Sequence, residues 1–127
     1  MTAGEAIAQA RALRPGCGIA EDRMKEWLRR QDGEIRARMI EPGAVEGYET
    51  AGADLLWEEG GLADSAELLA PFPFDGMYPH YLCAMADAAL GENERYAGAM
   101  ARCNAVLGEF AVWLRQNHQP PARQVTW

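Results

Sequence analysis

The feature that most constrains the fold is a periodic stripe of mostly apolar residues between positions 93 and 117. Its six members are three or four residues apart: Tyr96, Met100, Cys103, Leu107, Phe110 and Leu114. This spacing places all of them on one face of an α-helix, as in antiparallel helix packing. A helix over residues 93–117 would be about 37 Å long, at about 1.5 Å per residue. The sequence therefore predicts a long helix that buries one side against other helices.

A second stripe directly precedes this helix. Its members are Tyr78, Tyr81, Leu82, Met85 and Ala89, and it ends at Gly91. The short connection Gly91-Glu92-Asn93 predicts that the two helices form a tight antiparallel hairpin. The prolines of Pro71-Phe72-Pro73-Phe74 predict an extended approach to the hairpin, with Asp75 as the helix cap.

Two further helices are predicted in the first half of the chain. Thr2 and Glu5 have the spacing of a capping box, and Pro15 and Gly16 end the helix that follows, at residues 3–14. The second helix covers residues 20–40. Its predicted inward stripe is Met24, Trp27, Leu28, Gln31, Ile35 and Met39. Its remaining charged residues indicate a solvated outer face: Arg29, Arg30, Arg36 and Arg38 among Glu26, Asp32 and Glu34.

Residues 42–72 lack a helical stripe and contain glycine at positions 43, 47, 52, 60 and 61. Two short apolar pieces, at residues 54–57 and 67–70, flank Glu59-Gly60-Gly61 and predict a loose β-hairpin. A loop of this length is usually functional or disordered. Its apolar residues either fold back over the core or bind a partner: Tyr48, Leu55, Leu56 and Trp57.

Length and periodicity together predict one all-α domain over residues 1–127. It is a bundle of about four helices with a long irregular insertion, or arm, at 42–72 and an extended tail at 119–127. The tail supplies further candidate partner-binding residues: Pro120, Pro121, Arg123, Val125 and Trp127. No apolar run or leader pattern predicts a membrane span or export, and three cysteines favour a reduced compartment. A net charge of −7 argues against binding a DNA backbone.

Catalytic and metal-binding patterns are weak. His80 and Cys83 are three residues apart on a predicted helix, and Cys103 could face them from the next helix. Structural zinc usually has four ligands with closely paired cysteines, so a surface histidine beside core cysteines is the favoured interpretation. No phosphate-binding loop, nucleophile elbow or HExxH motif occurs. We therefore expect no enzyme and no cofactor; a metal-dependent enzyme that uses His80, Cys83 and nearby acids is a competing hypothesis.

The second half of the chain resembles a family of small structural proteins of tailed bacteriophages. The family form is similar to LLVPxPYDxLY, then YLxAxxDxxxxExxRYNNxMxxFN, then a long helix ending in HxP. The segment matching the first motif is residues 66–78. The later matches are Tyr81-Leu82, Ala84, Asp87, Glu92, Arg95-Tyr96, Met100, Asn104 and His118-Gln119-Pro120. Ala97-Gly98 replaces the usual two asparagines, and Cys103 replaces a phenylalanine.

The family is that of head–tail connectors, or adaptors. The resemblance implies a subunit that joins adjacent copies of itself into a ring under the portal protein and extends the DNA channel. The implied location is the head–tail junction of a virion assembled in the host cytoplasm. A neck or tail-completion protein would follow, DNA would pass without specific binding, and no membrane would be involved. The alternative is a small helical protein-binding or regulatory phage accessory module.

Overall fold

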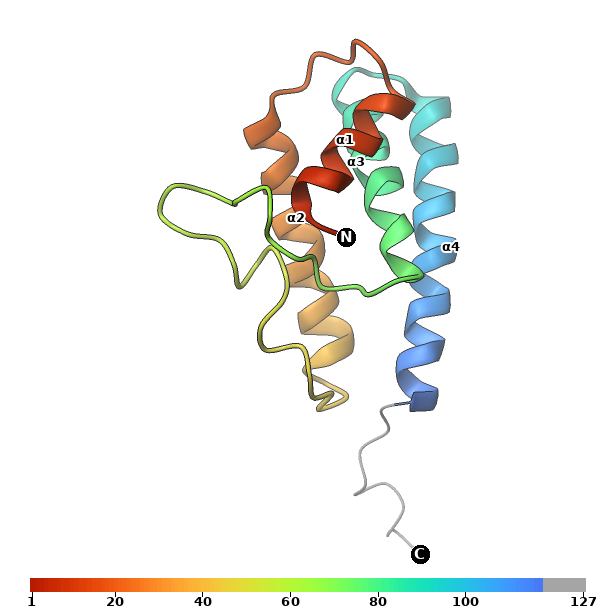
Figure 1. The fold of residues 1–127 in the computed structure, drawn as a ribbon. Helices are drawn as coiled ribbons and strands as arrows, with labels where there is room; N and C mark the ends of the chain where they lie inside the picture. Colours follow the sequence, from red (N-terminus) through yellow and green to blue (C-terminus); the bar gives the residue numbers. More distant parts are fainter. Residues whose placement is uncertain (118–127) are drawn as a thin grey trace, which may run out of the picture.

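The computed structural model describes residues 1–117, and within that range four helices pack together (Figure 1). They are α1 (Ala3–Leu13), α2 (Glu21–Ile35), α3 (Met77–Ala89) and α4 (Asn93–Asn117). A π-helical turn, η1 (Arg36–Ile40), extends α2, and a 3₁₀ turn, η2 (Phe74–Gly76), leads into α3. These residues form no β-strand, only two isolated bridges. The all-α fold class with a long insertion between the second and third helices is confirmed.

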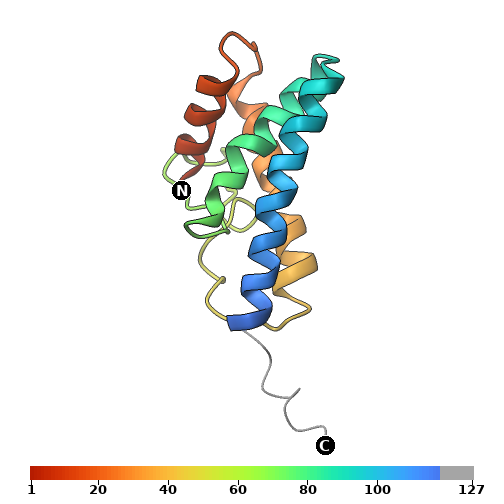
Figure 2. The same ribbon diagram turned by 90° about the vertical axis from the view of Figure 1, so that its right-hand side faces the viewer.

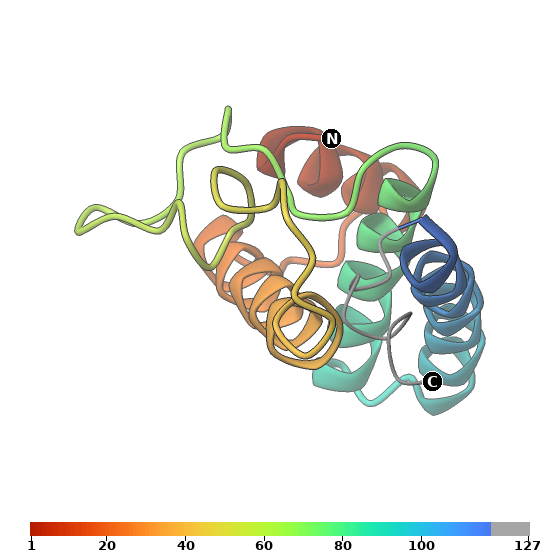
Figure 3. The same ribbon diagram turned by 90° about the horizontal axis from the view of Figure 1, so that it is seen from below.

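Helix α3 is the centre of the bundle. It packs against α4, α1 and α2, so it is buried on nearly every side (Figures 2 and 3). Its fully enclosed side chains include Met77, Tyr78 and Leu82. A helix surrounded in this way is apolar around most of its circumference, as the sequence of α3 is.

Helix α4 covers one side of α3 along the predicted stripe. Every member of that stripe is buried or half-buried, with Cys103, Phe110 and Leu114 the most enclosed. Phe110 lies 5.2 Å from the ring of Phe74 and 6.2 Å from that of Trp113, measured between ring centroids. The predicted antiparallel hairpin of the last two helices is therefore confirmed, and an aromatic cluster joins it to η2.

The first two helices illustrate one confirmed prediction, the cap of α1, and one wrong prediction, part of the outer face of α2. The Thr2 hydroxyl accepts the N–H of Glu5 at 3.2 Å, and the Glu5 carboxylate accepts the N–H of Thr2 at 3.1 Å, which is the predicted capping box. In α2, Arg29 and Arg38 are exposed as expected, but Asp32 is completely buried and Arg36 largely so. The prediction of a solvated outer face was wrong at Asp32 and Arg36, because both side chains bind the arm.

Asp75 does not cap α3. Residues 74–76 are already helical in η2, and Gly76, which precedes α3, has helical backbone angles and gives no side-chain cap. An aspartate cap needs an extended residue at the helix start, and none is present here. The Asp75 carboxylate instead accepts a hydrogen bond from the amino group of Met1 at 3.2 Å.

The predicted β-hairpin in residues 42–72 is also wrong. The arm leaves the end of η1, crosses α2 and returns past α1 to η2 (Figure 1). Its bridges join Glu58 to Gly61 and Thr2 to Glu67, so they form no ladder between the two apolar pieces. Ala53, Leu62 and Leu69 are buried, since the pieces pack on the bundle rather than on each other. Across residues 1–117, no helix is both long and apolar enough to span a membrane.

Candidate functional site

The arm, residues 42–72, contains the whole net charge of the protein. It has seven of the nineteen acidic residues and none of the twelve lysines and arginines. The rest of the chain has twelve acids and twelve bases, which balance. An arm with this composition repels itself and other acidic surfaces, so holding it on the bundle requires specific bonds.

The first of these bonds is a buried network around Asp32 of α2. One carboxylate oxygen accepts the N–H groups of Ala53, at 2.7 Å, and Leu69, at 3.1 Å. The other accepts the hydroxyl of Tyr78 at 2.5 Å. That hydroxyl in turn accepts the N–H of Ala70 at 2.8 Å. One carboxylate thus ties two separate parts of the arm, at residue 53 and at residues 69–70, to α2 and α3.

The protonation of this network follows from its burial. Burial raises the pKa of Asp32 to about 6, although the hydrogen bonds from Tyr78 and two backbone amides oppose the rise. Burial and the neighbouring Asp32 charge raise the pKa of Tyr78 well above its ordinary value. At neutral pH the tyrosine is therefore a donor and the carboxylate is mostly ionised, which matches the observed bonds.

The second anchor is Arg36 of η1. Its guanidinium donates to the Asp54 carboxylate at 2.6 Å, and to the carbonyl oxygens of Tyr48 and Ala51, each at 2.6 Å. Gly52 is required beside it, with φ +115°. A Cβ at this position would lie 2.5 Å from an Asp54 oxygen and 2.7 Å from an Arg36 nitrogen. The π-helical turn thus places an arginine where it closes the arm onto α2.

The predicted partner-binding residues of the arm lie at different depths. Tyr48, Leu56 and Trp57 are half-buried against the core, whereas Leu55 is 49% exposed. The Arg29 guanidinium lies 4.8 Å from the ring centroid of Trp57, a cation–π contact. The arm therefore folds back over the bundle and leaves Leu55 at the surface. The predicted tail residues, Pro120, Pro121, Arg123, Val125 and Trp127, lie outside the described residues, and so does the His118-Gln119-Pro120 match.

Sequence reasoning missed Phe72 as a candidate contact residue. Its side chain is 85% exposed, more than any other large apolar side chain in residues 1–117. The carbonyl of Pro71 accepts the N–H groups of Phe74, at 2.8 Å, and Asp75, at 3.1 Å, which fixes the turn around it. The available signal was its place between two prolines, which indicates a turn, and turns lie at the protein surface.

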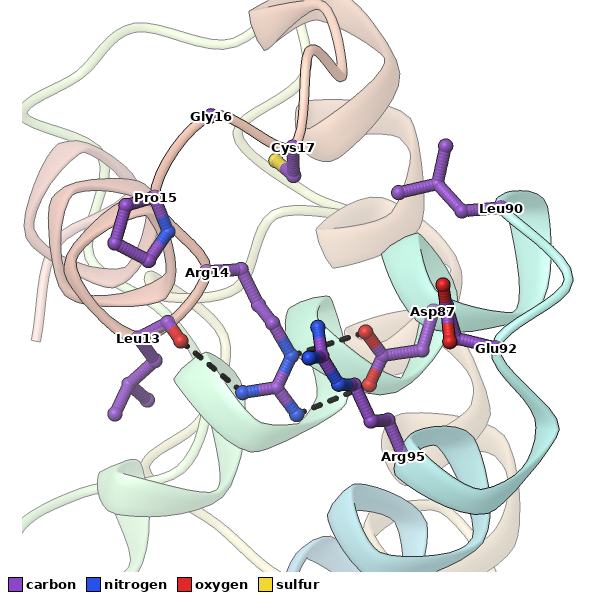
Figure 4. A pocket seen from close by; sticks show the side chains of 9 residues that line it. All are labelled: Leu13, Arg14, Pro15, Gly16, Cys17, Asp87, Leu90, Glu92 and Arg95. Carbon is purple, nitrogen blue, oxygen red and sulfur yellow. Dashed lines mark hydrogen bonds and ion pairs between the residues drawn. The ribbon is translucent and has the colours of Figure 1, made fainter.

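A second candidate surface lies at the opposite end of α3, where α1 ends beside α4. Arg14 binds Asp87 through two bonds, of 2.9 and 3.0 Å, at the edge of a pocket of about 620 Å³ (Figure 4). The same pocket is lined by Cys17, Glu92 and Arg95. Asp87 is buried, so this ion pair fastens α1 to α3.

Arginines gather on the α4 side of this pair. Arg14, Arg95 and Arg102 surround a smaller hollow of about 340 Å³, with Gly98 and Glu94 between them. We call Arg14, Arg95 and Arg102 the arginine cluster. Burial, followed by the charges of Arg102 and Arg14, lowers the pKa of the nearby His80. His80 is therefore mostly neutral at pH 7, and its surroundings are positive.

The cysteines singled out in the sequence do not meet in a reactive site. The Cys83 thiol is buried and 3.8 Å from the carbonyl oxygen of Ala10. Burial raises the pKa of Cys83 and raises that of Cys103 to about 11, so both remain thiols at neutral pH. Within residues 1–117, no three histidine, cysteine or acidic side chains are grouped so that they could hold a metal ion.

Comparison with known proteins does not assign this chain to a family. No protein-family model matches the chain, and no curated protein or solved structure matches it either.

Proposed function

We propose that this protein is a head–tail connector subunit of a tailed bacteriophage. Copies of it would form a ring under the portal protein and extend the DNA channel toward a neck or tail-completion protein. The proposal rests on the sequence resemblance of residues 66–120 to that family and on the structural part played by the matching residues.

The observation that carries the proposal is that the matched residues join the arm, α1 and α2 to the helical hairpin. Leu68 and Leu69 are buried, and the N–H of Leu69 binds Asp32. Tyr78 binds the same carboxylate, and Asp87 binds Arg14. A motif built from such residues determines how an arm is attached to a bundle, so a chain that shares it is expected to share the arrangement.

The surface suits a structural subunit in a DNA conduit. Phe72 and Leu55 are exposed apolar side chains that a protein partner would cover. The acidic arm repels a phosphate backbone, so DNA can pass without being held. The proposed partners are the portal protein, adjacent copies of the chain and a downstream neck protein, in the virion. The role is scaffolding, with no catalysis and no cofactor.

Co-sedimentation with the portal ring of the same phage tests this function. We expect the protein to move with the portal in a density gradient and to add a layer to the ring in electron micrographs. A portal ring from an unrelated phage is the control and should sediment alone. Failure to associate with its own portal would reject the connector function.

A groove between α2 and α3 supports the second candidate, a helical module that binds one soluble partner. The groove is about 560 Å³ in volume. Trp27, Met85 and Ala89 line it, and its charged lining residues are Arg23, Arg30 and the single acid Glu26. An amphipathic helix with acidic flanks would fit such a surface. Titration distinguishes the two functions, because a module saturates at one partner molecule and does not enlarge a portal ring.

A further inference from the structure

The middle of the arm forms an acidic projection closed by a turn. Glu58 and Gly61 bind each other through two backbone hydrogen bonds, of 3.0 and 2.8 Å, which close a turn over Glu59-Gly60. On one side of the turn Trp57 lies against Arg29, and on the other Leu62 is buried. We call residues 58–61 the acidic tip. Because both of its ends are held, the tip presents its charges at a fixed place.

The two carboxylates of the tip are unsatisfied within the described chain. Glu58 and Glu59 are exposed, and neither forms an ion pair with any residue in the range 1–117. Asp54 and Asp64 differ, since Asp54 pairs with Arg36 at 2.6 Å and Asp64 with Lys25 at 2.9 Å. Glu46 and Glu49 of the arm are also exposed and form no ion pair in this range, but they lie outside the turn. The acidic tip therefore carries negative charge that no basic side chain in the described part of the same subunit neutralises.

The arginine cluster is the complementary surface. Arg95 and Arg102 are seven residues apart on α4, so they share a face, and neither has an ion-pair partner in the described residues. Gly98 between them leaves the hollow of about 340 Å³ open. Glu94 also lines this hollow, and Arg14 is already paired with Asp87, so Arg95 and Arg102 are the guanidinium groups open to a partner. A projecting turn with two carboxylates is complementary in charge to these two groups.

The tip and the cluster lie on opposite sides of the molecule. In Figure 1 the projecting part of the arm is at the far left, while the first turns of α4 and the end of α1 are at the upper right, and Figure 3 shows the same separation. A subunit therefore cannot place its own tip in its own cluster. Contacts between such unlike faces repeat head to tail and close into a ring when the rotation permits.

We propose that the acidic tip of one subunit binds the arginine cluster of a second copy of this chain. Glu58 and Glu59 would accept hydrogen bonds from Arg95 and Arg102 across the contact. This contact deepens the proposed connector function, because it supplies the heterologous interface that a ring requires. Exposed ion pairs are screened by salt, so the contact should weaken between low salt and 1 M, where the screening length falls to about 3 Å.

Disulfide trapping without portal protein tests the contact. In a Cys17→Ser background, Gly60→Cys with Gly98→Cys places one thiol on the tip and one in the cluster, and it keeps both carboxylates of the tip. Oxidation at low salt should produce a ladder of dimers, trimers and larger species. The matched control is Gly60→Cys with Val112→Cys, which lies on a similar face of α4 about 21 Å further along. Equal or greater cross-linking in the control would overturn the proposal.

Charge reversal provides a second, independent test. Glu58→Lys/Glu59→Lys subunits and Arg95→Glu/Arg102→Glu subunits should each lose self-association in sedimentation velocity at low salt. An equal mixture should recover it, because each tip then meets a cluster of opposite charge. No recovery would contradict the contact. A ladder without portal binding would support the contact and reject the connector function. Portal binding without a ladder would support the connector function and reject the contact.

Discussion

The α3–α4 hairpin and the acidic arm are held in the fold by different means. The hairpin is stabilised by a continuous apolar seam, in which Leu82 and Phe110 are fully enclosed. The arm is held by separate polar contacts: Asp32 and Arg36 bind backbone groups and one carboxylate, and further backbone bonds join residues 64–68 to residues 1–4. A distributed seam tolerates the loss of single contacts, whereas a segment held by separate polar contacts loosens locally when one of them is removed. The following predictions separate the two modes.

Phe110→Ala should have the largest effect on stability. Phe110 is fully buried and contacts Phe74 and Trp113, so truncation leaves a cavity at the junction of α4 and η2. We expect the free energy of unfolding to fall by about 3–5 kcal/mol, with one cooperative transition. Denaturant titration followed by circular dichroism measures it. The exposed Val112→Ala is the control, and an equal loss there would contradict the seam.

Asp32→Ala should loosen the arm around Ala53 and Leu69 and leave the helices folded. The substitution leaves two buried backbone N–H groups and the Tyr78 hydroxyl without their acceptor, which should cost about 2–4 kcal/mol. Hydrogen exchange should accelerate in residues 50–72 and remain slow in α3 and α4. Tyr78→Phe should show a smaller change in the same segment. Unchanged exchange in the arm would mean that Asp32 does not anchor it.

The buried Asp32 should also give the protein a characteristic pH dependence. Its pKa is raised from 3.8 to about 6 on folding, so the native state binds more protons than the unfolded state between those values. The free energy of unfolding should therefore fall as pH rises from about 4 to 6, by up to about 3 kcal/mol. Subtracting the profile of Asp32→Asn isolates this contribution. A difference that grows more favourable with pH would contradict the assignment.

Arg36→Met should have the smallest effect of this series, a loss of about 2 kcal/mol. It removes the hydrogen bonds to Tyr48, Ala51 and Asp54 but retains much of the aliphatic stem. Proteolysis should then cut near residues 46–54 faster than in the unaltered protein. Arg38→Met is the matched control on an exposed arginine of the same turn, and we expect a change within about 0.5 kcal/mol.

These two modes also explain how much could be predicted from the sequence. The hairpin was predictable because each member of its stripe adds to one periodic signal. The placement of the arm was not predictable, because it depends on the backbone N–H groups of residues 53 and 69. Almost every residue type has such a group, so these bonds leave no pattern in the sequence. Asp32 still gave a usable signal: it lies next to Gln31 and four residues after Leu28, within the buried stripe. A charged residue there indicates a buried partner rather than a solvated face.

The candidate surface residues also differ in whether the sequence could predict them. Leu55 was predictable as an apolar residue in a long loop, and the structure places it at the surface. The arginine cluster was not predictable, because Arg14 and Arg95 come from distant segments. Only the packing of α1 beside α4 brings them together. Phe72 was missed because its exposure depends on a turn fixed by backbone hydrogen bonds.

The most direct test of the connector function is light scattering on the purified protein mixed with the portal ring of its own phage. The mass of the ring should grow by a number of subunits that matches the portal symmetry, and the unaltered portal should account for the remainder. A portal mass that does not change at saturating protein, with the protein remaining a separate species, would contradict the connector function.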